Sequence, residues 1–263
     1  MTILSTPITP TGWQEPEGVA ARGTVIVLPG RGETAATYGR LGRRLAADAY
    51  RVRVLPHTGP ADPVVAERLR RLLADPALPS PRVLLGSDTG ALTALRLAAG
   101  VSGIQAVVVA GTPDSSTPAI TTWQEELDAR TSCPTHRRVL ADDAGFRRGA
   151  LTDPAPAGAA VDLSSATSAG LPPDLPILVL HGGADPVSSV TAVRTALAGA
   201  GRLRVAVVEG AHHDVLNDVS HRSVAATLVL FLESLRLDPS LPVIVHGPDD
   251  RPDSDDRPGA EER

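Results

Sequence analysis

The stretch that decides the fold runs Arg82-Val83-Leu84-Leu85-Gly86-Ser87-Asp88-Thr89-Gly90-Ala91-Leu92-Thr93-Ala94-Leu95-Arg96-Leu97-Ala98-Ala99. A short apolar run reaches Gly86, three small polar residues follow, and Gly90 opens an apolar segment with helical spacing. The pattern predicts a strand at 82–86, a sharp turn and a helix at 89–99. Glycines flank turns of this kind because two backbones pass there too closely for a Cβ atom. The side chain that the turn holds clear of both elements is Asp88.

Strands and helices alternate on both sides of this stretch. We expect a short first strand at 2–5, further strands at 24–28, 51–55, 104–109, 176–181 and 203–208, and helices at 38–49, 62–75, 187–198 and 219–237. This alternation is typical of an α/β fold with a mostly parallel central sheet and helices on both faces. The ligand site of such a sheet lies at the carboxyl ends of its strands.

The alternation is interrupted between residues 111 and 173. This segment contains one predicted helix at 122–130 and a stretch rich in proline, alanine, glycine and serine at 152–173. An insertion of this length between two sheet strands is typical of a lid over the site rather than of a second domain. We therefore expect a single domain over 1–237 with a lid at about 111–173, followed by an acidic tail at 238–263, rich in proline and aspartate and largely disordered.

The composition excludes several classes of chemistry. All 25 basic residues are arginine, so Schiff-base chemistry and the lysine of a phosphate-binding P-loop are excluded. The single Cys133 cannot form an intrachain disulfide framework and is predicted to be an inert thiol in a polar loop. The net charge of −5 resides in the acidic tail, which leaves a neutral body with no electrostatic case for a nucleic acid partner. With no signal peptide and no long apolar run, we expect a cytoplasmic protein without membrane insertion, either a monomer or a homodimer.

Two further polar segments follow strands. Asp185 comes just after the strand at 176–181, and His213 comes just after the strand at 203–208. The chain order of nucleophile, acid and histidine is that of an α/β-hydrolase triad, in which each member follows a strand. We therefore expect a nitrogen of His213 to lie within about 4 Å of the carboxylates of both Asp88 and Asp185.

Four segments together resemble the monoacylglycerol lipase and serine aminopeptidase branch of the α/β hydrolases. That branch has a strand ending in H-G-x-G-E, the G-x-Nu-x-G nucleophile elbow, H-G-x-x-D and G-A-x-H-[DE]-x-x-N. The corresponding segments, over a resemblance that covers about residues 20–237, are Pro29-Gly30-Arg31-Gly32-Glu33, Gly86-Ser87-Asp88-Thr89-Gly90, His181-Gly182-Gly183-Ala184-Asp185 and Gly210-Ala211-His212-His213-Asp214-Val215-Leu216-Asn217. The resemblance implies an α/β-hydrolase fold, a small-molecule substrate and no cofactor.

The sequence departs from that pattern at Pro29, which replaces a histidine, and at Asp88, which replaces the nucleophilic serine. An aspartate at the elbow is a feature shared with haloalkane dehalogenases and epoxide hydrolases. It displaces a halide or an epoxide oxygen from an sp³ carbon and so forms an alkyl-enzyme ester. His213, supported by Asp185, would then activate the water that hydrolyses the ester, and the backbone N–H groups of Arg31 and Thr89 would form the oxyanion hole.

Alternative interpretations exist for several of these residues. Asp88 is also a preferred helix N-cap residue, and Ser87 becomes the nucleophile if the turn is shifted by one residue. His213 is favoured over His212 by the motif register. The Arg31 side chain either binds an anionic substrate or leaving group, or pairs with Glu33 or a lid acid.

Pocket residues are less well defined by the sequence. Ser87 and His57 are candidates to line the pocket, and Trp123 and His136 are candidate lid donors. For His57 a histidine of the turn before Thr58-Gly59-Pro60 is the favoured alternative, and for Trp123 it is a packing role within the lid. The predicted lid has no tyrosine of the kind that protonates an epoxide oxygen, and Thr89 stands where dehalogenases often place a halide-binding tryptophan. No metal site is expected.

Three functions therefore remain open from the sequence. The first is a hydrolase that uses Asp88 as its nucleophile. The second is a non-hydrolytic member of the fold, either a biosynthetic enzyme that transfers protons or a binding scaffold. The third is an ordinary lipase or esterase that uses Ser87.

Overall fold

A seven-stranded sheet forms the centre of the computed structural model, which describes residues 11–114, 119–153 and 170–245. The strand order is β1-β3-β2-β4-β5-β6-β7; β1 pairs antiparallel with β3, and all other neighbours pair parallel. The predicted, mostly parallel sheet is therefore confirmed. The strands are β1 (Gly12–Trp13), β2 (Gly23–Leu28), β3 (Tyr50–Val54), β4 (Arg82–Ser87), β5 (Ala106–Ala110), β6 (Pro176–Gly182) and β7 (Arg202–Val208). The strand expected at 2–5 lies outside the described residues.

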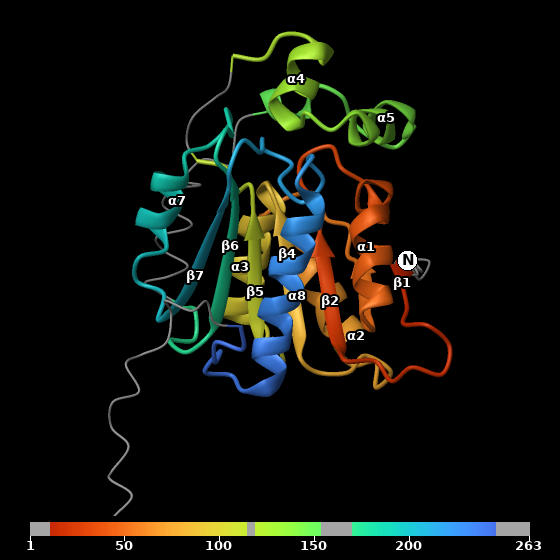
Figure 1. Cartoon of the computed structure of the whole chain (residues 1–263), viewed down its shortest axis with the longest axis vertical. Helices are drawn as coiled ribbons and strands as arrows, with labels where there is room; N and C mark the ends of the chain where they lie inside the picture. Colours follow the sequence, from red (N-terminus) through yellow and green to blue (C-terminus); the bar gives the residue numbers. More distant parts are fainter. Residues whose placement is uncertain (1–10, 115–118, 154–169, 246–263) are drawn as a thin grey trace, which may run out of the picture.

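Helices cover both faces of this sheet, with α8 on the near face and α3 behind it in Figure 1. The α-helices are α1 (Gly39–Ala47), α2 (Val65–Leu73), α3 (Thr89–Gly100), α4 (Trp123–Arg130), α5 (Pro134–Asp142), α7 (Val190–Ala196) and α8 (His221–Leu237), and the short 3₁₀ helices are η1 (Ala35–Tyr38) and η2 (Ala150–Thr152). Each helix predicted from the sequence is present, with ends that differ by up to three residues. The helix α5 was not predicted.

Burial on both faces explains why β2 shows no alternation of polar and apolar residues. Successive side chains of a strand point to opposite faces. Val25 and Val27 accordingly pack with α1 and α8, whereas Ile26 and Leu28 pack with α2, α3 and α7. All six residues of β2 are buried, because each face of this inner strand meets a helix layer.

The segment between β5 and β6 carries α4 and α5, which lie beyond the carboxyl ends of the parallel strands (Figure 1). Leu127, Leu140 and Phe146 form a small apolar cluster of their own within this segment. Cys133, which we expected in a polar loop, is buried at the N-terminus of α5. We missed α5 because its arginines gave the sequence a polar appearance, although Pro134 at its first turn is a typical start signal.

The tail begins in contact with the domain. Leu241 is buried in the core cluster on the α8 face, and its carbonyl accepts a hydrogen bond from Arg204. The last residues of the predicted tail, 246–263, lie outside the described residues.

Candidate active site

The turn between β4 and α3 holds Asp88 in a conformation that few residues adopt. Its backbone has φ 49° and ψ −125°, its N–H donates to the carbonyl of Ala110 at 2.9 Å, and its side chain does not cap α3. A Cβ atom on Gly86 would lie 2.2 Å from the carbonyl oxygen of Gly90, and one on Gly90 would lie 2.1 Å from that of Leu28. The two glycines are therefore required by close backbone packing, and the plain N-cap interpretation of Asp88 is wrong.

His213 bridges the two carboxylates that the sequence analysis selected. Its Nδ1 lies 2.9 Å from Oδ2 of Asp185, and its Nε2 lies 3.3 Å from Oδ1 of Asp88. Asp185 is held in place by the backbone N–H groups of Val187 and Ser188, which donate to its Oδ1 at 2.8 and 3.2 Å. The predicted convergence of the three side chains at the carboxyl edge of the sheet is confirmed.

The side chain of Arg31 covers the Asp88 carboxylate. Its Nε donates to Oδ2 at 2.8 Å and its Nη2 to Oδ1 at 2.8 Å, while its backbone N–H donates to Oδ2 at 2.8 Å. The remaining nitrogen, Nη1, donates to the carbonyls of Leu151 at 3.2 Å and Asp153 at 2.7 Å. Of the two alternatives for the Arg31 side chain, pairing with Glu33 or a lid acid is wrong, because its carboxylate partner is Asp88. Binding of an anionic substrate or leaving group stays a prediction. The bidentate fork and the backbone donor together occupy both carboxylate oxygens.

Burial and charge together set the protonation states of this site. Asp88 and His213 are each 1% exposed. Burial raises the pKa of Asp88, but the charge of Arg31 and the hydrogen bond from His213 outweigh burial and hold that pKa far below its usual range. Burial lowers the pKa of His213, but Asp185 and Asp88 outweigh it and raise that pKa to about 10. At neutral pH the site therefore holds two cations, Arg31 and His213, against two carboxylates.

A fully buried arginine connects the segment above the site to the loops that form it. Arg130, at the end of α4, donates through Nη2 to the carbonyl of Arg31 at 2.8 Å and to Oε1 of Glu126 at 3.1 Å. Its Nη1 lies 3.3 Å from Oδ1 of Asp214. The N–H groups of His213 and Asp214 in turn donate to the carbonyls of Ala129 at 3.3 Å and Arg130 at 2.8 Å. The end of α4 thus fixes the loops on which Arg31 and His213 stand. The sequence of α4 does not reveal this role, because an i,i+4 Glu–Arg pair usually marks a solvated helix face.

Glu33 belongs to a second buried contact beneath the loop that follows β2. Its Oε2 accepts a hydrogen bond from the N–H of Gly30 at 2.6 Å and another from the Tyr38 hydroxyl. Burial, followed by the charge of Asp214, raises the pKa of Glu33 to about 7. Glu33 therefore supports the backbone of the Arg31 loop and leaves the Arg31 side chain free to reach Asp88.

The other residues selected from the sequence lie at varying distances from the triad. Ser87 is the buried last residue of β4, one position before Asp88. Thr89, the second expected oxyanion-hole residue, is the buried first residue of α3. His57 lies behind the elbow, where its Nε2 is 2.9 Å from the carbonyl of Pro29. Burial lowers the pKa of His57. This favours a neutral ring that is held by its hydrogen bonds and has a structural role.

The two expected lid donors do not contact the carboxylate of Asp88. Trp123 packs against Phe146 with a ring separation of 5.6 Å, and the guanidinium of Arg148 lies 4.9 Å from the Trp123 ring centre. His136 is buried, and its Nε2 lies 2.9 Å from Oδ2 of Asp214. In the structure Trp123 packs within the insertion, and His136 supports the loop that carries His213. His212 points away to Asp218, with 3.1 Å between Nδ1 and Oδ2.

A cavity of about 420 Å³ lies between the insertion and the loops that carry Asp185 and His213, although none of the three triad side chains lines it. Its lining residues are Ala119, Ile120, Glu125, Asp128 and Ala129 from the insertion, and Ala184, Pro186 and His212, which are chain neighbours of Asp185 and His213. In the part of the chain that the structure describes, no group of three or more histidine, cysteine, aspartate or glutamate side chains is arranged to hold a metal ion. No helix among the described residues is both long and apolar enough to cross a lipid bilayer.

The sheet order, the elbow and the three residues that follow strands together define the α/β-hydrolase fold, which this chain adopts. The solved structures that it resembles include a soluble variant of monoglyceride lipase from Saccharomyces cerevisiae, bound to a substrate analogue. That protein is 15% identical, with a TM-score of 0.67, over 84% of this chain and 90% of the lipase.

Two further solved structures agree with this fold. Monoacylglycerol lipase from Paleococcus ferrophilus is 17% identical, with a TM-score of 0.64, over 86% of this chain and 98% of the lipase. A thermostable carboxyl esterase from Bacillus coagulans, in complex with glycerol, is 17% identical, with a TM-score of 0.61, over 86% of this chain and 93% of the esterase. No protein-family model matches the sequence, and no curated protein matches it.

Proposed function

We propose that this chain is a hydrolase of small organic electrophiles that uses Asp88 as a covalent nucleophile. The observation that carries the proposal is the alignment of Asp88, at the elbow, with His213 at 3.3 Å and Asp185 behind it at 2.9 Å. A carboxylate displaces leaving groups from sp³ carbon, whereas the mixed anhydride it forms with an ester carbonyl reverts. The substrate class is therefore an alkyl halide or an epoxide, and no cofactor is needed.

In the first step, an oxygen of Asp88 bonds to the substrate carbon. The carbon–halogen or carbon–oxygen bond breaks, and its electron pair leaves with the halide or the epoxide oxygen. A halide needs no proton. An epoxide oxygen needs one, and His213 can supply it, because its pKa of about 10 makes it an imidazolium at neutral pH.

The second step uses His213 as a base. Alkylation converts Asp88 into a neutral ester, and the negative charge that helped to raise the pKa of His213 is lost. His213 then loses its proton at neutral pH, or has already given it to the leaving oxygen, and accepts a proton from water. The resulting hydroxide attacks the carboxyl carbon of Asp88, and the N–H groups of Arg31 and Thr89 stabilise the oxyanion of the tetrahedral intermediate. The bond between this carbon and the alkyl oxygen then breaks, the departing oxygen takes the proton that His213 accepted from water, and the alcohol leaves. The carboxyl group of Asp88 gives its proton to His213, which restores the carboxylate and the imidazolium.

Arg31 has to release one oxygen of Asp88 before the first step. An arginine on the nucleophile suits a substrate with an electronegative or weakly anionic group, because that group takes over the guanidinium when it binds. The cavity of about 420 Å³ below α4 has room for the remainder of such a molecule. We further propose that α4 and α5 act as the lid, and that the protein works in the cytoplasm.

The bidentate contact of Arg31 with the Asp88 carboxylate also favours a second candidate function, which is non-hydrolytic. Both carboxylate oxygens accept donors from Arg31, so a site that never releases them would serve only for binding or proton transfer. An esterase that uses Ser87 agrees with the lipases and esterases among the solved structures. It is disfavoured, because Ser87 is the last residue of β4 and stands one residue before the elbow position, whereas His213 Nε2 lies 3.3 Å from Asp88.

The test is intact-protein mass spectrometry of the His213→Ala variant after exposure to panels of epoxides, alkyl halides and esters. Without the base, the alkyl ester should accumulate and map to Asp88. The matched control is the His213→Ala, Asp88→Asn double variant, which should form no adduct, whereas adding Ser87→Ala to His213→Ala should leave adduct formation unchanged. A folded variant that forms no adduct with any panel supports the non-hydrolytic role. Labelling of Ser87 by a serine-directed phosphonate supports the esterase.

A further inference from the structure

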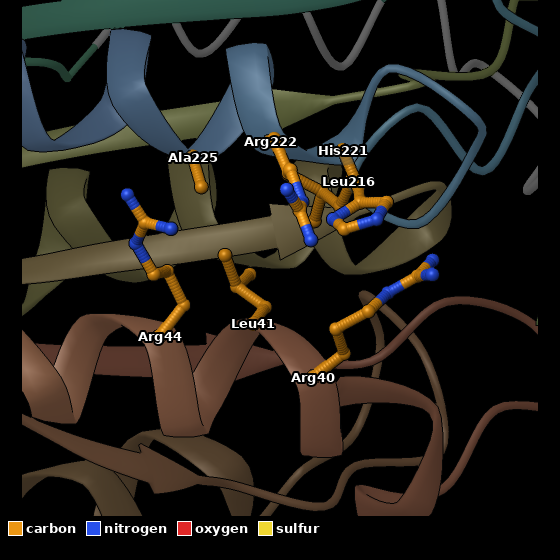
Figure 2. A pocket seen from close by; sticks show the side chains of 7 residues that line it. All are labelled: Arg40, Leu41, Arg44, Leu216, His221, Arg222 and Ala225. Atoms are coloured by element: carbon orange, nitrogen blue, oxygen red, sulfur yellow. The ribbon is translucent and has the colours of Figure 1, made fainter.

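A cavity of about 160 Å³ lies between α1 and the start of α8, outside the candidate active site (Figure 2). The side chains of Leu41 and Arg44 extend from α1 toward α8, and those of His221 and Arg222 reach back toward α1. The cavity is thus walled by two helices that the sheet holds side by side, and nothing in the proposed hydrolysis uses it.

Every charged or titratable side chain that lines this cavity is basic: Arg40, Arg44, His221 and Arg222. The guanidinium of Arg222 makes no hydrogen bond or ion pair to any residue that the structure describes. Arg44 has only an exposed contact of 3.4 Å to Asp48, one turn further along α1. Burial, followed by repulsion from the three arginines, lowers the pKa of His221. The local potential is therefore positive, and the exposed Asp48 compensates only Arg44.

The helix dipole adds to this imbalance. The N-terminus of a helix carries a partial positive charge, which acidic residues in the first turn normally offset. α8 is 17 residues long, has no acid in its first turn, begins with His221 and Arg222, and has no side-chain cap from Ser220. His221 and Arg222 at the positive end of this long helix, with Arg40 and Arg44 of α1 across the cavity, raise the free energy of the folded state unless an anion binds among them.

The base of the cavity is apolar. It consists of Leu41, Leu216 and Ala225, which belong to the buried core. Arginine forks match the oxygens of a phosphate group, and an apolar base suits a short carbon chain attached to that group. We propose that this cavity is a binding site for a phosphate dianion, either inorganic phosphate or the head of a small phosphomonoester.

The test measures binding of inorganic phosphate and of butyl phosphate by isothermal titration calorimetry, with ionic strength held constant with sodium chloride. The informative variant is Arg44→Gln combined with Arg222→Gln, because neither residue belongs to the catalytic arrangement. Arg40 is left intact, since it donates to the carbonyl of Asn217 and to Sγ of Cys133 and so has a structural role. The matched control is Arg43→Gln, which removes a charge from α1 at a position that does not line the cavity.

The wild-type protein and Arg43→Gln should bind phosphate equally. The double variant should bind it at least about tenfold more weakly, because it loses two charge-assisted contacts. Tighter binding of butyl phosphate than of inorganic phosphate would support the use of the apolar base. The proposal is overturned if the wild-type protein shows no phosphate binding at constant ionic strength, or if the folded double variant binds as tightly as the wild-type protein.

Discussion

Arg31 and Asp88 form a buried, bidentate ion pair, with distances of 2.8 Å from Nε to Oδ2 and 2.8 Å from Nη2 to Oδ1. The two residues are 57 positions apart, and each follows a neighbouring parallel strand, β2 or β4. The backbone N–H of Arg31, which we propose as an oxyanion donor, and the side chain of the same residue thus both bind the candidate nucleophile.

Breaking this pair should destabilise the protein strongly. Arg31→Met leaves the Asp88 carboxylate buried without its main cation, and Asp88→Asn leaves the guanidinium without its anion. Each change should lower the free energy of unfolding by about 3 to 5 kcal/mol, and the double variant should lose less than the sum of the two. Denaturant unfolding of the four proteins measures this coupling. The exposed pair Arg71–Glu67 serves as the control, for which Arg71→Met should cost under about 1 kcal/mol. Additive effects of the two site changes would mean that the ion pair does not form.

The charge of His213 should make stability depend on pH at the alkaline side. Its pKa is raised from 6.5 to about 10 in the folded protein, so its contribution to stability is complete below pH 6.5 and is lost as the pH rises through about 10. The stability difference between the wild-type protein and His213→Gln should therefore shrink between pH 7 and pH 10. The carboxylate of Asp88 affects stability at the acidic side instead. Because its pKa is lowered in the folded protein, its contribution to the free energy of unfolding is lost only in strong acid.

NMR titration of the His213 ring tests the cause of that shift. In Asp88→Asn the negative charge next to Nε2 is absent, as it is in the proposed alkyl-enzyme, and the pKa of His213 should fall well below that of the wild-type protein. An unchanged pKa would contradict the switch of His213 from acid to base. His221, which contacts neither Asp88 nor Asp185, should titrate identically in both proteins and serves as the internal reference.

The elbow should tolerate no side chain at Gly90. Its Cβ would lie 2.1 Å from the carbonyl oxygen of Leu28, and backbone atoms cannot move aside as a flexible side chain can. Gly90→Ala should therefore destabilise the protein by about 3 kcal/mol or more and distort the turn that holds Asp88. Gly100→Ala, at the other end of α3, meets no atom within 4 Å and should be neutral or slightly stabilising. Thermal unfolding of both variants makes the comparison, and equal melting temperatures would refute the required close packing.

Arg130 should determine how firmly α4 is held over the site. Arg130→Met leaves Glu126 and Asp214 buried without their cation and removes the donor to the Arg31 carbonyl. We expect a loss of about 3 to 5 kcal/mol and faster amide hydrogen exchange in α4 and in the loop around His213. The control is Arg138→Met on α5, an exposed position, where exchange should be unchanged. If amide hydrogen exchange in α4 is as slow in the Arg130→Met variant as in the wild-type protein, the buried arginine does not hold the helix.

Local patterns were sufficient for the parallel strands β2 to β7, the elbow and the order of the three site residues, but not for the two-residue edge strand β1. Strands of β2 type are continuous apolar runs, and Gly86 and Gly90 mark a turn that only glycine permits, so each could be recognised without knowledge of distant residues. Parallel strands bring their carboxyl ends to one edge, and the meeting of Asp88, Asp185 and His213 followed from that topology.

The partner of Arg31, the burial of Arg130 and the positions of Trp123 and His136 could not be obtained in the same way. Each depends on which side chains from distant segments share a low-dielectric space, and a charge run on α4 looks the same whether it is solvated or buried. The sequence by itself determined most of the helices and strands, α5 and β1 excepted, and which residues follow the strands, because hydrophobic period and turn chemistry are local. Only the tertiary structure decided which charges neutralise one another, because the free energy of a buried charge is set by all the groups that surround it.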